Sequence, residues 1–509
     1  MEWEPRRKEE NMRITNKMMT NNMLYNINRN RANLNILESQ YSSGKKIQRP
    51  SEDPIVAVRS LKLRTNLTEL NQYYEKNIPD AKSWMNVTES ALDTVNGLFT
   101  PMHGYFLQGA NDTLSKSDRQ SVLANLEQLA TQLYHEGNTD YAGRYVFTGY
   151  KTDTSLLFEG DTNNLDYTIT ENFTSLDIEN ITKVKEATDF DSYDLAALSP
   201  EDIDKAPDLI EGHRIRLSYK DLKGEEGADG QPVIGIEIRK GDTTETFDNI
   251  VTMSMNDPEA YQPEAGAINY IPETGELILG EDVFNNLRQA DDINITYKKD
   301  TFNKDELRPE HYFDCIKVDN NDPELREINY IQKDQQIQYE INFNQKLTIN
   351  SQAKKAYSHD IIRGIEDLRL AAEDVSKTER RIKEVEKYIE DPTITDKAGL
   401  ERLLETLNGE LSLKNKVLQE RFSKGMTTIT EQEELVNIEV ADLGSRYVRL
   451  ELTESRLETQ QVDFMDLLSN NEDVDLVDTI IKYGSAETIY NASLAAASQI
   501  VKSTLLDFL

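Results

Sequence analysis

The side chains best able to do chemistry in this chain are scattered rather than grouped. No H-E-x-x-H pair occurs, and no cysteine group lies beside a histidine. Zinc sites need such spacings because three or four ligands must converge on one ion. The sequence therefore predicts no zinc site. The five histidines are His103, His135, His213, His311 and His359.

Two short stretches resemble nucleotide- and calcium-binding loops but lack the essential residues. The glycines of residues 104–109 have P-loop spacing, yet Ala-Asn at 110–111 stands where Lys and Ser or Thr hold phosphate and Mg²⁺. Residues 319–322, Asp-Asn-Asn-Asp, open like an EF-hand loop, but Pro323 follows and the glycine is missing. We therefore interpret the first stretch as a chance match that binds no nucleotide, and the second as a surface turn.

Cys315 is the only cysteine, so the chain can form no internal disulfide. This fits a cytosolic protein, and equally a protein that leaves the cell unfolded, where a crosslink would be an obstacle. No nucleophile signature surrounds Cys315, and a buried small apolar group is the simpler interpretation. We expect no enzyme, no cofactor and no bound metal.

The strongest patterns lie instead at the two ends of the chain. A stripe with alternating spacings of four and three occurs at each end. Such a stripe is the seam of a helix that packs lengthwise against another helix. Because chain ends usually fray unless something holds them, we expect the two ends to pair with each other or with neighbouring molecules. The first stripe is Met23, Ile27, Asn30, Leu34, Leu37 and Tyr41, and the second is Leu476, Ile480, Tyr483, Glu487, Tyr490, Leu494, Ala497, Val501, Thr504 and Phe508.

The composition favours a large acidic protein with several cores. A length of 509 residues suggests roughly three domains at about 150 residues each. The net charge of −35 should repel nucleic acid and anionic membranes. Residues 13–49 are the exception, with seven basic residues against one acidic residue, Glu38. This stretch is either a solvated helix face or a contact with acidic neighbours, including other copies.

Targeting signals are absent by the usual criteria. No apolar run approaches the about 20 residues that cross a membrane. Residues 1–11 are polar and lack the apolar core of a Sec signal peptide. We expect them to be a disordered extension, with Met12 a natural second start.

The first region, residues 12 to about 158, is expected to be mostly helical. After a break at 49–54, Ser51 is the predicted N-cap of the next helix, which carries a four–three stripe over residues 63–98. Pro79 should kink this helix or mark a join. A further amphipathic helix is predicted over residues 117–134.

The second region, residues 159–350, is predicted to be strand-rich, because apolar residues alternate with polar ones there. The alternating sets are Ile234, Ile236 and Ile238; Ile293, Ile295 and Tyr297; and Ile337, Tyr339, Ile341 and Phe343. The insert could be one large or two small domains.

The third region, residues 351–509, returns to helix. Leu443, Leu450, Leu457 and Phe464 recur at period seven, the spacing of a coiled-coil seam. A charged stretch, residues 377–424, is broken by Asp-Pro-Thr at 391–393 and predicts a helical hairpin.

Five stretches of sequence stand out beside these patterns. They are M-R-I-T-N-K-M at 12–18, S-S-G-K-K-I-Q-R-P-S-E-D-P at 42–54, G-R-Y-V-F-T-G-Y-K-T-D-T at 143–154, G-S-R at 444–446 and L-L-D-F-L at 505–509. Together they resemble the flagellar hook-associated protein 3 family, the flagellin-related proteins of the hook–filament junction, with Glu52 replacing an Asp. The matching motif residues are Pro50, Asp53, Pro54, Gly143, Tyr145, Phe147, Gly149, Thr152 and Thr154.

The resemblance implies an α+β fold in which the N- and C-terminal regions pair as a long coiled coil and bundle, with a β-rich inserted domain. Its domains would be residues 12–50 with 470–509, a terminal coiled coil; 51–158 with 351–469, a helical bundle; and 159–350, a variable outer domain of one or two subdomains. The hairpin within residues 377–424 would either extend the bundle or brace the insert.

The resemblance also implies partners. Subunits of this family leave the cell through the flagellar type III apparatus without a cleaved signal peptide and form a layer between hook and filament. Their partners would be other copies, another hook-associated protein, flagellin and a chaperone that masks the C-terminal helix, with no nucleic acid and no membrane insertion. The chaperone-binding and assembly seam would be Leu476, Ile480, Tyr483, Tyr490, Leu494, Ala497, Val501, Leu505 and Phe508.

Two alternatives remain open from the sequence. The chain could be a filament flagellin, although its opening and its final residues favour the junction protein. The insert could also be an adhesive or hydrolytic domain on a flagellar scaffold. Within the seams, the polar residues Asn30, Glu487 and Thr504 are candidates for fixing the register between helices.

Overall fold

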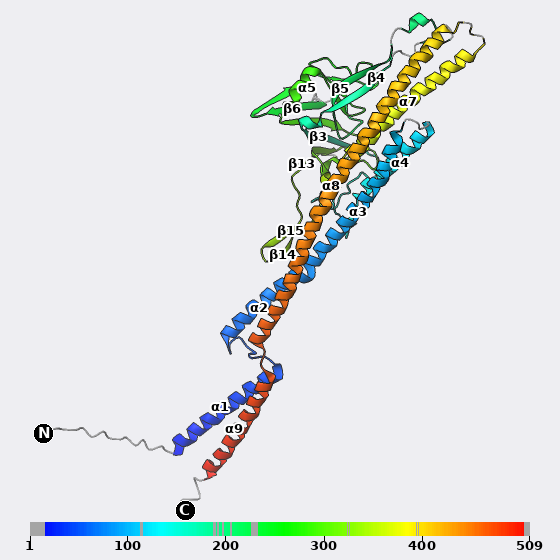
Figure 1. The fold of residues 1–509 in the computed structure, drawn as a ribbon. Coiled ribbons are helices and arrows are strands. Elements are labelled where there is room, and N and C mark those ends of the chain that lie inside the picture. Colours follow the sequence, from blue (N-terminus) through cyan, green and yellow to red (C-terminus); the bar gives the residue numbers. More distant parts are fainter. Residues whose placement is uncertain are drawn as a thin grey trace, which may run out of the picture. The chain divides into compact units, whose positions relative to one another are not determined.

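The computed structural model describes residues 16–502 apart from short gaps at 112–115, 187–189, 191–192, 196–197, 204–205, 225–232, 323, 325, 393 and 395. Long helices from both ends of the chain and a strand-rich middle make up the fold (Figure 1). The α+β prediction is therefore confirmed. Among the described residues, no helix is both long and apolar enough to cross a membrane.

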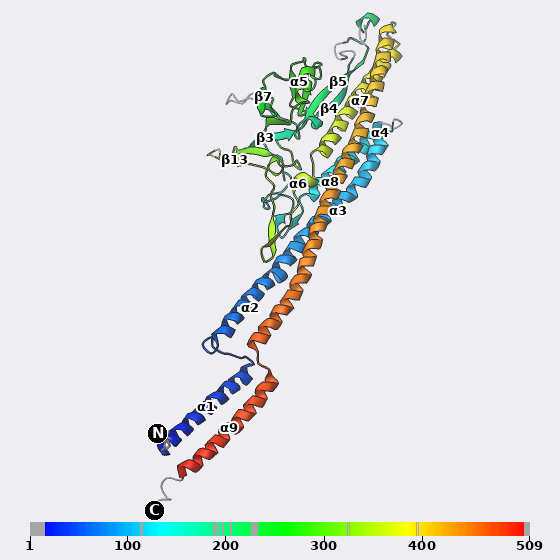
Figure 2. The same ribbon diagram turned by 60° about the vertical axis from the view of Figure 1, so that its left-hand side comes forward.

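The described chain forms two compact units. The first contains residues up to 79, 340–345 and 451 onward, and the second contains 80–339 and 346–450. In the first unit α1 (Asn16–Ser43) and α9 (Leu476–Lys502) lie side by side in both views (Figures 1 and 2). The helix α2 (Pro54–Gln72) and the C-terminal part of α8 (Ala398–Glu472) complete this unit.

The helix α2 begins at a different cap from the one predicted. Asp53 is the N-cap, and its Oδ1 accepts the backbone N–H groups of Ile55 at 3.0 Å and Val56 at 3.1 Å. The prediction of Ser51 was wrong because Pro54 occupies the first helical position. Its fixed φ and missing N–H suit that position, so the cap directly precedes it. Glu52 instead accepts the backbone N–H of Gln48 at 2.8 Å.

A π-helical turn joins α2 to α3. This turn, η1 (Tyr73–Asn77), lies directly before α3 (Ile78–Gly109). Such turns insert one extra residue per turn and interrupt the regular helical ladder. The join expected at Pro79 is thus present, and the interruption lies just before the proline.

The second unit contains the remaining helices. α4 (Lys116–Glu136) corresponds to the amphipathic helix predicted over residues 117–134, and it packs against α7 (Asp360–Glu390). The predicted hairpin is confirmed, since α7 ends at Glu390 and α8 begins at Ala398. Leu443 and Leu450 of the period-seven seam are fully buried in this unit.

Two larger sheets make up most of the insert. A five-stranded sheet has the order β4-β5-β10-β9-β8 and a six-stranded sheet the order β13-β12-β3-β11-β6-β7. All of their strand pairs are antiparallel except β8 with β9. Their strands are β3 (Leu165–Phe173), β4 (Glu179–Lys185), β5 (Asp208–Arg216), β6 (Ile234–Lys240), β7 (Thr243–Phe247), β8 (Ile250–Thr252), β9 (Ile268–Ile271), β10 (Glu276–Leu279), β11 (Asp292–Lys299), β12 (Asp314–Asp319) and β13 (Glu327–Tyr330).

Two of the three predicted alternating sets form part of the core of this insert. The third set, within residues 337–343, lies outside that core, with Ile341 buried and Phe343 37% exposed. Ile238 pairs with Ile293 and Ile236 with Ile295 on neighbouring strands, so two of the alternating sets bury one face together. Residues of the other sheet, such as Ile215 and Leu277, belong to the same apolar cluster. The two sheets are therefore packed face to face over a shared core.

Shorter elements complete the fold. Two small antiparallel hairpins, β1–β2 and β14–β15, flank the larger sheets in sequence. The bounds are β1 (Asp140–Tyr141), β2 (Arg144–Tyr145), β14 (Gln338–Asn342), β15 (Gln345–Thr348), α5 (Glu281–Leu287), α6 (Ala353–Ala356) and the 3₁₀ turns η2 (Ser175–Asp177), η4 (Pro200–Asp202) and η5 (Pro309–His311).

Candidate functional site, the paired terminal helices

The histidine, cysteine and carboxylate side chains form no metal-binding cluster in the part of the chain that the structure describes. No group of three or more His, Cys, Asp or Glu side chains there could hold a metal ion. Gly104 and Gly109 lie inside α3, so they cannot form a phosphate-binding loop. Asp319 ends β12 and a turn follows it, as expected, and Cys315 is buried on the same strand. The thiol's burial raises its pKa to about 12, which keeps it protonated and unreactive.

The seam on α1 faces α9 as the stripe predicted. Met23, Ile27, Leu34 and Leu37 are all partly buried, while the α1 residues between them are mostly exposed. Tyr41, at the end of the stripe, is 48% exposed, but its ring stacks on Tyr483 of α9 with the centroids 6.5 Å apart. The α1 stripe is therefore the line along which the two helices meet.

Of the seven predicted seam residues of α9 whose side chains the structure describes, three are partly buried and four are exposed. Tyr483, Tyr490 and Ala497 are partly buried. Leu476, Ile480 and Leu494 are instead 51%, 49% and 42% exposed, and Glu487 is exposed too. The remaining covered positions are Thr479, Ala486 and Ser493. The side of α9 that meets α1 therefore combines small side chains with the two tyrosines.

The remaining predicted seam residues cannot be placed. Val501 lies in α9, but its side chain is not described. Thr504, Leu505 and Phe508 lie outside the described residues.

One polar contact crosses the seam. The side-chain amide of Asn30 donates a hydrogen bond of 2.8 Å to Oγ of Ser493. A polar pair inside an apolar seam is satisfied in only one alignment of the helices, so it favours one register. Of the proposed register residues, Asn30 makes such a contact, but Glu487 faces away from the seam.

The break after α1 and the break between α8 and α9 lie beside each other. Gly44 follows α1 with φ +70°, a conformation that glycine adopts without strain. The backbone N–H of Val474 donates to the carbonyl of Gly44 at 3.0 Å, and that of Lys46 donates to the carbonyl of Glu472 at 2.6 Å. The motif at 42–54 and residues 470–475 thus form a short two-stranded connector, which we call the connector below.

Charge neutralisation stabilises the connector. Glu472 is only 6% exposed and accepts two hydrogen bonds from Arg64, at 2.7 and 2.6 Å. Lys45 contacts Glu472 at 3.2 Å and Asp473 at 2.5 Å. The Arg64 hydrogen bonds lower the pKa of Glu472, and the Lys45 contact lowers that of Asp473. At neutral pH both carboxylates are therefore ionised and paired, and Lys45 of the basic N-terminal stretch contacts its own chain.

The second motif, residues 143–154, makes a compact turn in the second unit. Ala142 and Gly143 both have positive φ between β1 and β2, as a tight hairpin of the primed type requires. Phe147 is 1% exposed and packs edge-on against Tyr357 with centroids 5.1 Å apart. The backbone N–H of Tyr145 donates to the carbonyl of Thr152 at 2.8 Å. These motif residues shape the backbone and fill a core.

Gly149 and Thr154 complete this turn. Gly149 has φ +63°, and a side chain there would meet Gln335 Oε1 at 2.2 Å. The backbone N–H of Thr154 donates to the carbonyl of Lys151 at 3.1 Å. The left-handed backbone at position 149 therefore favours glycine.

Comparison with known proteins agrees with the motifs. Residues 14–152 match the bacterial flagellin N-terminal helical region. The chain is 33% identical over 143 residues to flagellar hook-associated protein 3 of Salmonella typhimurium (28% of this chain, 45% of that protein). It is 32% identical over 149 residues to the protein of the same name from Escherichia coli (29% and 47%) and 30% identical over 128 residues to a flagellin of Clostridium tyrobutyricum (25% and 34%). The chain thus spans less than half the length of the hook-associated proteins it matches.

Proposed function

We propose that this chain, which has the helical N-terminal region of the flagellin family and is similar to hook-associated protein 3, is a structural subunit of the bacterial flagellum. It assembles through α1 and α9 as the adapter between hook and filament. Its neighbours are other copies, another hook-associated protein on the hook side and flagellin on the filament side. The role is one of assembly rather than catalysis.

The observation that carries this proposal is the apolar surface left on the paired helices. Six large apolar residues of α9 are at least 42% exposed. They are Leu476, Val477, Ile480, Ile481, Ile489 and Leu494. α1 adds Met18, Met19, Leu24, Tyr25, Ile36 and Tyr41, each at least 47% exposed. A surface this apolar along a helix pair favours burial against neighbouring subunits.

The same surface supports export with a chaperone. α9 has 27 residues, about 40 Å at 1.5 Å per residue. Left bare in the cytoplasm, its apolar residues would promote aggregation. We propose that a flagellar export chaperone covers this helix and that the subunit is secreted through the flagellar apparatus.

We also propose that three parts of the chain have different structural roles. Residues 12–50 with 470–509 would form the terminal assembly domain, 51–158 with 351–469 a helical bundle, and 159–350 a projecting outer domain. The extension at 1–11 would take no part in assembly.

The proposal is tested by complementing a deletion strain. Removing residues from Leu476 onward should leave a folded body, seen by circular dichroism, that restores no filaments. A finer variant, Leu476→Asp with Ile480→Asp, charges only the outward face of α9 and should keep the α1–α9 pair but abolish assembly. The matched control is Glu487→Gln, on an exposed position of the same helix. Normal filaments with the truncated chain would refute the proposal.

Filament flagellin is the second candidate, because a flagellin is among the matched relatives. Electron microscopy of the deletion strain separates the two. If the deleted protein is the junction protein, the strain has bare hooks and sheds flagellin into the medium. Hooks with normal filaments would overturn the junction assignment, and hooks without any flagellin in the medium would favour the flagellin.

A further inference from the structure

Three of the contacts between the β-rich part of the second unit and the α7–α8 hairpin lie at different places along the hairpin. Two of them are ion clusters and one is apolar. We propose that these contacts make the hairpin a brace, which holds the β-rich domain in one orientation. The strands β4 and β5 and the hairpin then unfold and refold locally as one cooperative unit. The proposal does not depend on the flagellar function.

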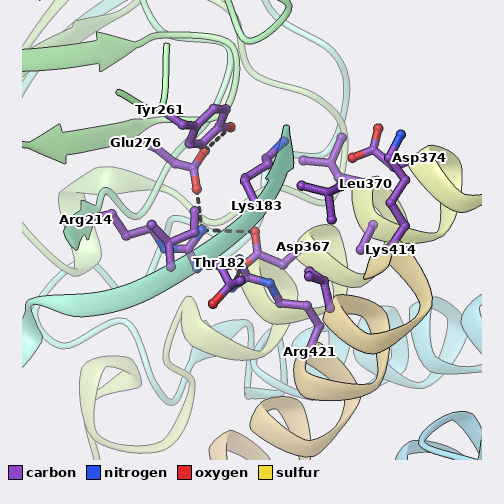
Figure 3. Close-up of a pocket in the computed structure, with 14 residues that line it drawn as sticks. Thr182, Lys183, Arg214, Tyr261, Glu276, Asp367, Leu370, Asp374, Lys414 and Arg421 are labelled. Atoms are coloured by element: carbon purple, nitrogen blue, oxygen red, sulfur yellow. Dashed lines mark hydrogen bonds and ion pairs between the residues drawn. The ribbon is translucent and has the colours of Figure 1, made fainter. Parts of the chain in front are cut away.

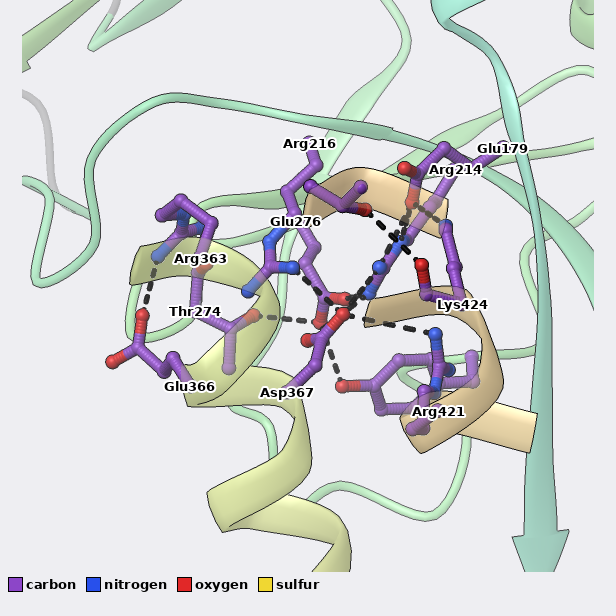
Figure 4. A network of polar contacts seen from close by, with 12 residues as sticks. Glu179, Arg214, Arg216, Thr274, Glu276, Arg363, Glu366, Asp367, Arg421 and Lys424 are labelled. Carbon is purple, nitrogen blue, oxygen red and sulfur yellow. Dashed lines mark hydrogen bonds and ion pairs between the residues drawn. The ribbon is translucent and has the colours of Figure 1, made fainter. Parts of the chain in front are cut away.

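The first contact is centred on a buried arginine. Arg214 of β5 is 1% exposed and donates to Glu179 of β4 at 2.9 Å and to Glu276 of β10. It also donates to Asp367 of α7 at 2.6 Å (Figure 4). Arg214 is therefore neutralised by two sheet carboxylates and one helix carboxylate. A buried charge of this kind is stable only while all its partners stay in place.

Further cations tie the same cluster to both helices. Arg216 of β5 donates to Asp367 at 2.7 Å, and Arg421 of α8 lies 3.7 Å from the same carboxylate. Lys424 of α8 pairs with Glu179 at 2.7 Å. The cluster thus connects β4 and β5 to α7 and α8 at once (Figure 4).

The second contact is centred on an acidic residue. Glu186, just after β4, meets Arg381 at 2.9 Å, Lys414 at 3.1 Å and Lys377 at 3.6 Å. Lys377 and Arg381 belong to α7 and Lys414 to α8. Here the sheet side supplies the anion and the helices supply the cations, as in the pair of Glu179 with Lys424, whereas Arg214 and Arg216 place cations of the sheet on Asp367 of α7. Because both charge arrangements occur along the contact, sliding would place like charges together.

The space between the two clusters is too small for a ligand. A cavity of about 40 Å³ lies there, lined among others by Arg214, Asp367 and Lys414 (Figure 3). A cavity of that size holds only one or a few water molecules. The space between the two clusters therefore leaves no room for a ligand that would separate them.

The third contact is apolar and caps the end of the hairpin. Phe190, Leu195, Leu198 and Ile203, between β4 and β5, share a buried cluster with residues of α7 and α8 that include Val385 and Leu403. A side chain at Gly399 would meet the carbonyl oxygen of Leu198 at 2.1 Å, so the two segments are in close contact.

These contacts are spread along α7. Asp367, Arg381 and Val385 follow one another over 18 positions (385 − 367), roughly 27 Å at 1.5 Å per residue. A single contact leaves a domain free to pivot, but contacts spaced along a rigid helix fix its direction. The spacing therefore supports a brace rather than a tether.

Hydrogen exchange of the full chain tests the brace. Asp367→Asn removes the helix carboxylate from the first cluster, and Glu186→Gln neutralises the second. The control is Glu373→Gln, since Glu373 lies on α7, is 61% exposed and pairs only with Arg369 among the described residues. Each cluster variant should raise amide exchange about tenfold or more in both the β4–β5 pair and α7. The core pair β3–β11 should keep its protection in both variants, and the control should change neither region.

Two results would overturn the proposal. If exchange rises only in the element that carries the substitution, the sheet and the helices are not coupled. If Glu186→Gln also raises amide exchange in β3 and β11, the clusters belong to the general core of the domain and are not a separate contact that holds its orientation. Glu186 is a third exposed, at 33%, so its variant has the better chance of folding if Asp367→Asn fails to fold.

Discussion

Asn30 in α1 and Ser493 in α9 are 463 positions apart in sequence, yet their side chains share a hydrogen bond of 2.8 Å. Asn30 interrupts an otherwise apolar stripe, and Ser493 lies among the small residues that α9 turns toward α1. The contact gives up some apolar burial and in return favours one alignment of the two helices. The stacked pair of Tyr41 and Tyr483 lies further along the same seam.

This pair predicts a loss of register control in Asn30→Leu. A leucine would add apolar contact, so the terminal helices should become equally or more resistant to heat by circular dichroism. Assembly should nevertheless fall, because other alignments become as stable as the native one. Assembly is measured by the swimming in soft agar of a deletion strain that carries the Asn30→Leu variant. Asn35→Leu, at an exposed position of the same helix, is the control. Full motility of Asn30→Leu would show that the hydrogen bond does not set the register.

The connector predicts a loss of stability in acid. The pKa of Glu472 is lowered below its ordinary value of 4.5, chiefly by the Arg64 hydrogen bonds. The stabilisation is therefore full above about pH 4.5 and is lost as the pH falls through the lower folded-state pKa. Glu472→Gln should cost about 1 kcal/mol at pH 7, because the pair is partly screened by solvent. Urea denaturation at pH 7 and pH 3 should show a smaller pH effect in this variant than in the wild type. Glu458→Gln, on an exposed position of α8, should behave as the wild type.

A buried glutamate predicts the opposite pH dependence in the β-rich domain. Burial raises the pKa of Glu171 to about 7. It is hydrogen-bonded to Tyr297 and to Ser218, whose backbone N–H and Oγ donate at 3.1 and 2.9 Å. The folded state binds a proton more tightly than the unfolded state, so the contribution of Glu171 to stability falls as the pH rises from about 4.5 to 7. The effect should be at most about 3 kcal/mol.

Thermal unfolding of the wild type and Glu171→Gln from pH 5 to pH 8 measures this contribution. The variant cannot ionise at this position, so its midpoint should fall less over that range. Equal pH profiles for the two proteins would mean that Glu171 does not titrate there. Glu237→Gln, on the exposed face of β6, is the control.

The second motif predicts a large packing cost in Phe147→Ala. The ring is 1% exposed and contacts Tyr357, so truncation leaves a cavity in a close-packed region. We expect a loss of about 3 to 5 kcal/mol in the free energy of unfolding, measured with urea. Tyr150→Ala is the matched control within the motif, because Tyr150 is 64% exposed. A loss below about 1 kcal/mol for Phe147→Ala would contradict the assigned core role.

Several features were predictable because local chemistry decides them. The stripe on α1, the helix over residues 117–134 and the break between α7 and α8 follow from periodicity and from a proline. The strands β6 and β11 followed from alternation alone. The cap of α2 was predicted at Ser51 but lies at Asp53, because the proline at the first helical position places the cap directly before it.

Other features could not be read from local pattern. Nothing near Arg214 or Glu186 in sequence signals their partners on α7 and α8, which lie more than 150 residues away. Whether the hairpin extends a bundle or braces the insert depends on those distant charges. Periodicity reports the faces of one element, but not which element covers each face.

The sequence by itself determined that both ends of this chain are helices with apolar seams, since a four–three spacing admits no other regular structure. Only the tertiary structure decided which side of α9 meets α1. That helix has large apolar residues on more than one side, so its pattern alone permits several rotations. The packing against α1 selects the rotation that covers Thr479, Tyr483, Ala486, Tyr490 and Ser493 and leaves Leu476, Ile480 and Leu494 exposed.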